Sequence, residues 1–201
     1  MKRIAQFIVL LLLACLTAGC ASGLISKQPA PVYYRLDYPV PDVSPPHRFD
    51  QGLRIWTFAE SKPYDHTEMV VLTGTRQVSA SSGFQWITTP GHLLADRLAQ
   101  DLGKSRLFPI VVGSDSPQSA PFELSGHVFT FAWRRQHDQS RAVLDVQVSL
   151  SGADHKVMFE KHYHFESKPA AGHSSADFAA SMSGLVRKLS TQLQRDLGSL
   201  E

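Results

Sequence analysis

The chain has 201 residues and a formal net charge of +2 at pH 7, and 43% of its residues are hydrophobic, which suits one domain with a substantial core. Lys2 and Arg3 account for the surplus charge, so residues 20–201 are balanced and lack the basic excess of nucleic-acid-binding domains. Both cysteines, Cys15 and Cys20, lie near the N-terminus, which excludes a disulfide, a thiol nucleophile and a zinc–thiolate cluster from the remainder.

The first residues have the pattern of a secretory signal. Lys2 and Arg3 give a positive start, Phe7–Leu13 is apolar, and small residues precede Cys20. The apolar run is shorter than the roughly 20 residues that a membrane-spanning helix needs. We therefore predict a signal peptide at residues 1–19, with cleavage before Cys20. An ordinary signal peptide with an incidental cysteine is the alternative.

The pentapeptide Leu16–Cys20 resembles the bacterial lipobox. The resemblance implies that Cys20 is lipidated, with a diacylglyceryl group on its sulfur and an acyl chain such as palmitate on the new amino terminus. Stable anchoring takes about two lipid signals, which three acyl chains exceed. Ala21 rather than aspartate follows, and by the same resemblance this favours the outer membrane. The segment Leu13–Cys15 is a rival site that would leave a very short apolar region.

Residues 20–32 are small, polar and proline-bearing, which predicts a lipidated tether, and residues 33–201 form the predicted domain. The first half of this domain contains short β patterns, at Val32–Tyr38, Leu53–Phe58, Met69–Leu72 and Arg76–Ser79. The last two flank Thr73-Gly74-Thr75 and predict a hairpin. The polar stretch Ser79–Gly83 predicts a flexible segment.

Leucines spaced four apart predict two helices. The first follows Thr89-Pro90 and ends at Gly103, and the last runs from about Asp177 to Leu197 before Gly198. Strand patterns lie between them, at Leu107–Val112, Phe122–Trp133, Ala142–Leu150 and Val157–Phe165. The last three predict an antiparallel meander, and the slip of the apolar phase in Phe122–Trp133 predicts either a bulge or a strand that is covered on both sides near its end. The fold class is therefore α+β: one two-layer domain, a largely antiparallel sheet and both helices on one face.

One cluster of polar residues deserves a chemical interpretation. Glu160, His162, His164 and Glu166 alternate along one strand and share a face. Two imidazoles and a carboxylate are ligands that catalytic zinc uses, so a zinc hydrolase is one hypothesis. The alternative, which we favour, is the solvent face of a strand. No glycine-rich phosphate loop or G-x-S-x-G motif is present, so we predict no enzyme activity, no catalytic or metal-binding residue, and no cofactor beyond the lipid on Cys20.

Two aromatic residues are candidates for binding a partner. Phe84 and Trp86 follow the predicted flexible stretch, and aromatics on a mobile loop suit a protein interface. Aromatic residues in strands are more often core residues, which is the alternative for Trp56, Trp86 and Trp133.

Several weak motifs follow one another along the chain: the Tyr33-Tyr34-x-Leu36 strand, Trp86 and Pro90 before the Leu94, Leu98, Leu102 helix, the Phe122–Gly126 segment, and the leucine-rich last helix. Their order is similar to that of the ABC-type transport auxiliary lipoprotein family. The resemblance covers most of the mature chain. It implies an outer-membrane lipoprotein whose domain faces the periplasm and holds the periplasmic MCE-domain protein of an ABC lipid transport system at that membrane.

Other functions remain open at the level of the sequence. A small α+β lipoprotein also suits an assembly factor or pilotin for another outer-membrane machine, because fold does not settle function. A carrier that holds acyl chains itself is a third hypothesis, beside the zinc hydrolase. MCE proteins form rings, so a homo-oligomer of this chain is compatible with the resemblance.

Overall fold

The computed structural model describes residues 30–43, 49–74, 76–136, 139–168 and 174–200. The signal peptide, Cys20 and most of the tether lie outside the described residues, so their predictions stay predictions. The chain divides after Ala30, and the unit that follows, Pro31–Glu201, contains every helix and strand below. No helix within the described residues is long and apolar enough to cross a membrane.

The described residues form a nine-stranded mixed sheet and two helices. The strands are β1 (Val32–Tyr34), β2 (Leu53–Ile55), β3 (Ala59–Glu60), β4 (Glu68–Thr73), β5 (Gln77–Trp86), β6 (Val111–Gly113), β7 (Phe122–Gln136), β8 (Gln139–Ser151) and β9 (Val157–Glu166); the helices are α2 (Pro90–Ser105) and α3 (Ser175–Leu197). Strand β7 is the centre, because β8 pairs with one side of it and β2, β3 and β4 pair with the other side.

The predicted meander is confirmed. Strands β7, β8 and β9 pair antiparallel in sequence order, and the β7–β8 register shifts between Val128 and Thr130. Phe129 is therefore the extra residue of a bulge, which explains the slip of the apolar phase seen in the sequence. The hairpin of β4 and β5 is confirmed as well. By contrast, β2, β3 and β4 run parallel to β7, so the sheet is mixed where the short strands join it.

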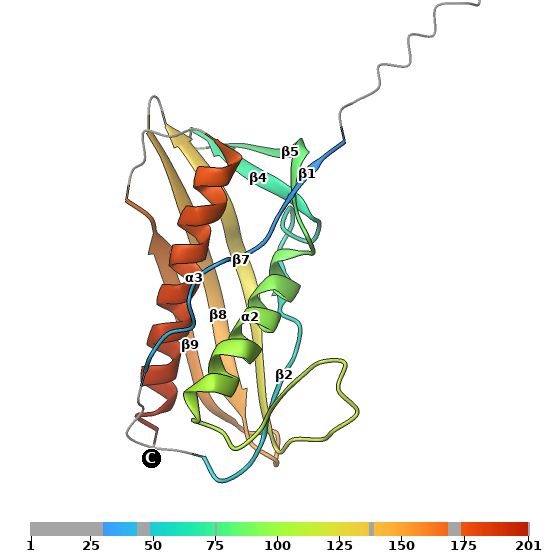
Figure 1. The fold of residues 1–201 in the computed structure, drawn as a ribbon, viewed down its shortest axis with the longest axis vertical. Coiled ribbons are helices and arrows are strands. Elements are labelled where there is room, and N and C mark those ends of the chain that lie inside the picture. The colour runs from blue at the N-terminus through green and yellow to red at the C-terminus, as the bar shows by residue number, and fades with distance from the viewer. Residues whose placement is uncertain (1–29, 44–48, 75, 137–138, 169–173, 201) are drawn as a thin grey trace, which may run out of the picture. The chain divides into compact units, whose positions relative to one another are not determined.

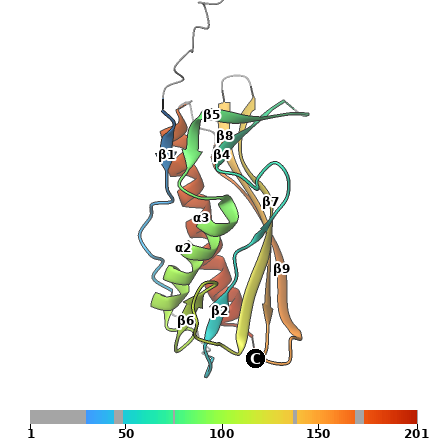
Figure 2. The same cartoon turned by 90° about the vertical axis from the view of Figure 1, so that its right-hand side faces the viewer.

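Both helices cover the same face of the sheet, as predicted (Figures 1 and 2). Helix α3 begins with a capping box, in which the Ser174 hydroxyl accepts from the Asp177 N–H and the Asp177 carboxylate accepts from the Ser174 N–H. Helix α2 continues past Gly103, where we expected it to end. Ser105 explains the difference, since its hydroxyl donates to the Leu102 carbonyl and accepts from the Leu107 N–H. Arg106 then ends the helix at φ 58°.

The core lies between the helices and the inward side chains of the long strands. The stripe of α3 predicted to be apolar is buried, at Phe178, Met182, Leu185, Val186, Leu189, Leu193 and Leu197. The predicted strand Leu107–Val112 is shorter than expected, because β6 begins only at Val111. Leu107 and Phe108 are buried ahead of it, and Pro109 between them and the strand has no N–H to donate to a ladder.

Candidate functional site

The segment Ser79–Gly83 is part of a strand rather than the flexible loop that its composition predicted. Ser79, Ala80 and Ser81 pair with Val71, Val70 and Met69 of β4. The ladder bonds use backbone groups, so small polar side chains do not prevent the pairing. Ser82 and Gly83 fall where the register between β4 and β5 shifts.

The two aromatic residues predicted to bind a partner have different environments. Trp86 is 0% exposed, and its ring makes edge contacts with Phe131 and Phe178 at centroid distances of 5.3 and 5.5 Å. Trp86 is therefore a core residue in this fold, which is the alternative that the sequence left open, and it offers no surface to a partner. Phe84 is 40% exposed, and its role in binding a partner stays a prediction. Trp133 is also buried, whereas Trp56 is partly exposed.

A groove lies beside Phe84 on the helix-covered face, at the end of the sheet where α3 begins. It has a volume of about 280 Å³. Its apolar lining comes from β4, β5 and β7, and its polar lining comes from small hydroxyl-bearing residues and one arginine: Met69, Val71, Thr73, Ser79, Ala80, Ser81, Phe84, Trp133, Arg135 and Ser175. The groove exists because the apolar face of the sheet continues past the first residue of the helix.

Positive charge borders this groove. The Arg135 guanidinium lies 3.9 Å from the centroid of the Trp133 ring, a cation–π contact that fixes the side chain without neutralising it. Arg76, which directly precedes β5, is exposed but does not line the groove. Neither arginine forms an ion pair with any residue that the structure describes. The groove therefore combines an apolar floor, an exposed aromatic ring and the guanidinium of Arg135.

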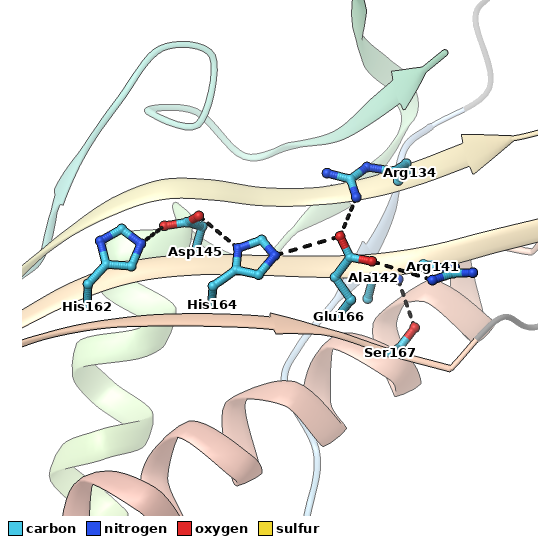
Figure 3. A network of polar contacts seen from close by, with 8 residues as sticks. All are labelled: Arg134, Arg141, Ala142, Asp145, His162, His164, Glu166 and Ser167. Carbon is cyan, nitrogen blue, oxygen red and sulfur yellow. Dashed lines mark hydrogen bonds and ion pairs between the residues drawn. The ribbon is translucent and has the colours of Figure 1, made fainter. Parts of the chain in front are cut away.

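The histidines of β9 lie on the opposite face of the sheet (Figure 3). Lys161 and Tyr163 both contact Asp196 of α3, so the residues between and after them point away from the helix. His162 Nε2 lies 2.6 Å from Asp145 Oδ1, and His164 Nδ1 lies 2.9 Å from Asp145 Oδ2. One carboxylate of β8 thus holds both imidazoles.

This network continues to the end of β9. Glu166 lies 3.7 Å from His164 Nε2, contacts Arg134, and lies 3.6 Å from Arg141 Nη1 (Figure 3). Glu160 is separate, because it accepts a hydrogen bond from Ser149. The predicted sharing of a face by His162, His164 and Glu166 is confirmed. The pattern alone did not identify Asp145 as their partner, which requires the register of β8 against β9.

The network is a chain of polar contacts across three strands. Carboxylates alternate along it with imidazole and guanidinium groups. Among the described residues, no group of three or more histidine, cysteine or acidic side chains is arranged to hold a metal ion. The zinc hypothesis therefore gains no support from the geometry.

On the helix-covered face, Asp196 fastens β9 to α3. Its carboxylate accepts from the Tyr163 hydroxyl at 2.7 Å and from Lys161 Nζ at 2.8 Å. Burial raises the pKa of Tyr163, and the Asp196 carboxylate raises it further. Burial would also raise the pKa of Asp196, but the hydrogen bonds from Lys161, Tyr163 and Gln192 outweigh it and lower that pKa.

Comparison with known proteins adds a family and a fold. Residues 34–194 match the family model described as the ABC-type transport auxiliary lipoprotein component. No curated protein matches the chain. A crystal structure of a Xanthomonas campestris protein is similar over 81% of this chain and 92% of its own, with a TM-score of 0.71 and 15% identity.

Two further solved structures are similar to the chain. A crystal structure of an uncharacterized protein is similar over 84% of this chain and 99% of its own, with a TM-score of 0.66 and 15% identity. The PelC dodecamer from Paraburkholderia phytofirmans reaches a TM-score of 0.48 at 14% identity, over 77% of this chain and 94% of its own. These identities show a shared fold alone, and the PelC likeness is too weak to bear on assembly, so a homo-oligomer stays a prediction.

Proposed function

The chain belongs to the family of ABC-type transport auxiliary lipoprotein components, and from this premise we propose that it is the outer-membrane accessory protein of an MCE-type ABC lipid transport system. Its domain would face the periplasm and hold the periplasmic MCE-domain protein at the outer membrane. The observation that carries the proposal is the family match, which extends from β1 into α3 and so covers nearly the whole folded domain.

The N-terminal sequence supplies the anchor that this role needs. Cys20 lies 14 residues before the start of the match at residue 34, so a short segment separates the lipid from the folded domain. Three acyl chains on Cys20 would keep the domain at the membrane surface, because each buried methylene contributes about 0.8 kcal/mol. Ala21 after the cysteine favours the outer membrane as that surface.

We propose further that the domain acts by binding rather than by catalysis. The two histidines of β9 share the Asp145 carboxylate, so one ring nitrogen of each already has a partner within the fold. The groove beside Phe84 presents an exposed aromatic ring and an arginine, Arg135, which are residue types that protein interfaces favour. Metal analysis of the purified chain checks this part, and one zinc per chain that is lost in His162→Ala would contradict it.

Capture from intact cell envelopes tests the proposed partner. The full-length chain, tagged at its C-terminus and cross-linked before extraction, should retain an MCE-domain protein together with its permease and ATPase. An otherwise identical lipoprotein signal fused to an unrelated domain is the control for membrane association alone. Recovery of secretion or pilus components in place of the transporter would contradict the proposal and favour the assembly-factor function.

A further inference from the structure

One edge of the sheet is open at β5. Strand β5 pairs with β4 on one side, and on its other side β1 pairs only with Phe84–Trp86. Within the described residues, the stretch from Gln77 to Gly83 has no strand beside it on that side. Alternate residues of a strand point their N–H and C=O groups to each side, so this stretch presents a row of unpaired donors and acceptors.

Up to Ser81 this edge has little of the usual protection against strand addition, and the irregularity in the β4–β5 register begins only beyond it. Proteins protect open edges with charged side chains, with proline, or by keeping the edge strand short. The β9 edge contains Glu160, Lys161 and Glu166, and the β6 edge is only three residues long. The stretch Gln77–Gly83, by contrast, contains no charged residue and no proline. An unprotected edge of this length is the structure that peptide recognition by strand addition uses.

The surroundings of the edge indicate which side chains an added strand would carry. Val78 is 52% exposed beside the open edge, and Phe84 borders the groove of about 280 Å³. Residues of the edge strand itself, Ser79, Ala80 and Ser81, line that groove. Arg135 lines that groove and Arg76 directly precedes the edge strand, and neither has an acidic partner among the described residues, so acidic side chains on the incoming strand would be complementary.

We propose that the edge of β5 from Gln77 to Ser81 receives an extended acidic segment of the transporter's MCE-domain protein as an added strand. Backbone hydrogen bonds to the edge give the affinity. An apolar side chain in the groove beside Phe84 and acidic side chains near Arg76 and Arg135 give the specificity. This inference rests on the proposed function, because it assigns the surface through which the partner is held.

Photo-cross-linking locates the contact in the full-length lipidated chain. A photoreactive phenylalanine replaces Ser79 on the edge or, as control, Glu160 on β9, and illuminated envelopes are analysed by peptide mass spectrometry. We expect a cross-link from position 79 to a peptide of the MCE-domain protein that contains Asp or Glu, and none from position 160. A cross-link from position 79 to residues 21–30 of the same chain, to a second copy, or to nothing would overturn the proposal.

Two proline variants test the backbone bonds. Adjacent residues point to opposite sides, so one of Val78→Pro and Ser79→Pro removes an N–H that faces the open edge, and the other removes one that faces β4. The variant that loses the N–H facing β4 should have a lower melting temperature than wild type. The variant that loses the N–H facing the open edge should have the melting temperature of wild type. It should capture about fivefold less MCE-domain protein, which is the effect of one lost hydrogen bond. Undiminished capture by the stable variant would contradict strand addition.

Charge reversal provides a test that does not depend on the folding of the proline variants. Arg76→Glu should lower capture by about fivefold or more, because an acidic segment would then meet a like charge. Arg187→Glu on the exposed face of α3 is the matched control and should leave capture unchanged. If wild type captures the MCE-domain protein and Arg76→Glu captures it equally, the edge proposal fails while the proposed function stands. If wild type captures no transporter component, both fail.

Discussion

The Phe178 ring of α3 lies parallel to the Trp133 indole of β7, with ring centroids 5.5 Å apart and 2° between the planes. The same indole carries the Arg135 guanidinium at the border of the groove. The first turn of α3 therefore positions the residue that forms the floor of the groove, and the aromatic core and the candidate binding surface are one packing unit.

This packing predicts a contrast between two phenylalanines. Phe178→Ala removes a fully buried ring that contacts both Trp86 and Trp133, and should lower the free energy of unfolding by about 3–5 kcal/mol. Phe84→Ala removes a ring that is partly exposed, and should lower the free energy of unfolding by much less. Urea unfolding of the domain measures both. Equal losses would show that Phe84 is a structural residue rather than part of a binding surface.

A charge in the apolar stripe of α3 should be far more damaging than one on its outer face. Leu189 is fully buried, and Leu189→Asp places an unpaired carboxylate there at a cost of several kcal/mol, against a total stability of about 5–15 kcal/mol. We expect loss of the cooperative thermal transition. Arg187→Asp, two residues away and exposed, is the control and should melt within a few degrees of wild type. A similar melting temperature for both variants would mean that the stripe is not core.

Gly126 is a position where the fold has no room for a side chain. A Cβ atom there would lie 2.5 Å from the Phe58 ring and 2.6 Å from the Gln147 carbonyl oxygen. Gly126→Ala should therefore destabilise the domain by about 1–3 kcal/mol. Gly184→Ala in α3 meets no atom within 4 Å and should be neutral or stabilise the helix by up to about 1 kcal/mol. Calorimetry of the two variants should give changes of opposite sign or clearly different size.

The contact between Asp196 and β9 predicts part of the acid sensitivity of the domain. Because the pKa of Asp196 is lower in the folded chain than in the unfolded chain, acid favours unfolding. The stabilisation is complete above the unfolded pKa of about 4 and is lost as the pH falls through the folded pKa. Asp196→Asn should be less stable at neutral pH, and its stability should fall less steeply than that of wild type below about pH 4. Parallel curves of melting temperature against pH would contradict this role.

The elements that the sequence predicted correctly are those with a strong internal period. The leucine stripe of α3 and the alternation in β8 each fix a buried face without information from elsewhere in the chain, whereas in β9 only Tyr163 is buried. The phase slip in β7 indicated a bulge as one explanation, and the β7–β8 register places that bulge at Phe129. These features follow from local patterns, which is why the α+β class and the side of the sheet that the helices cover could be predicted.

The features that could not be predicted from the sequence depend on contacts between segments that are distant along the chain. Ser79–Ser81 is polar and small, and only its pairing with β4 makes it a strand. Trp86 follows that segment closely, yet its burial depends on Phe131 and Phe178 from other elements. Likewise, the partner of His162 and His164 is set by the β8–β9 register, which shifts near the turn. The open edge of β5 is visible only once β1 is known to cover just three of its residues.

The claim that the chain holds a transporter at the outer membrane is tested most directly by density-gradient separation of cross-linked membranes. With the wild-type chain, the lipoprotein should sediment with the outer membrane and carry a share of the MCE-domain protein into those fractions. Cys20→Ala should leave the chain unprocessed or soluble, because it lacks the lipidated residue, and the MCE-domain protein should return to the inner-membrane fractions. An unchanged distribution of both proteins in Cys20→Ala, with a mature-sized chain still in the outer membrane, would contradict the account.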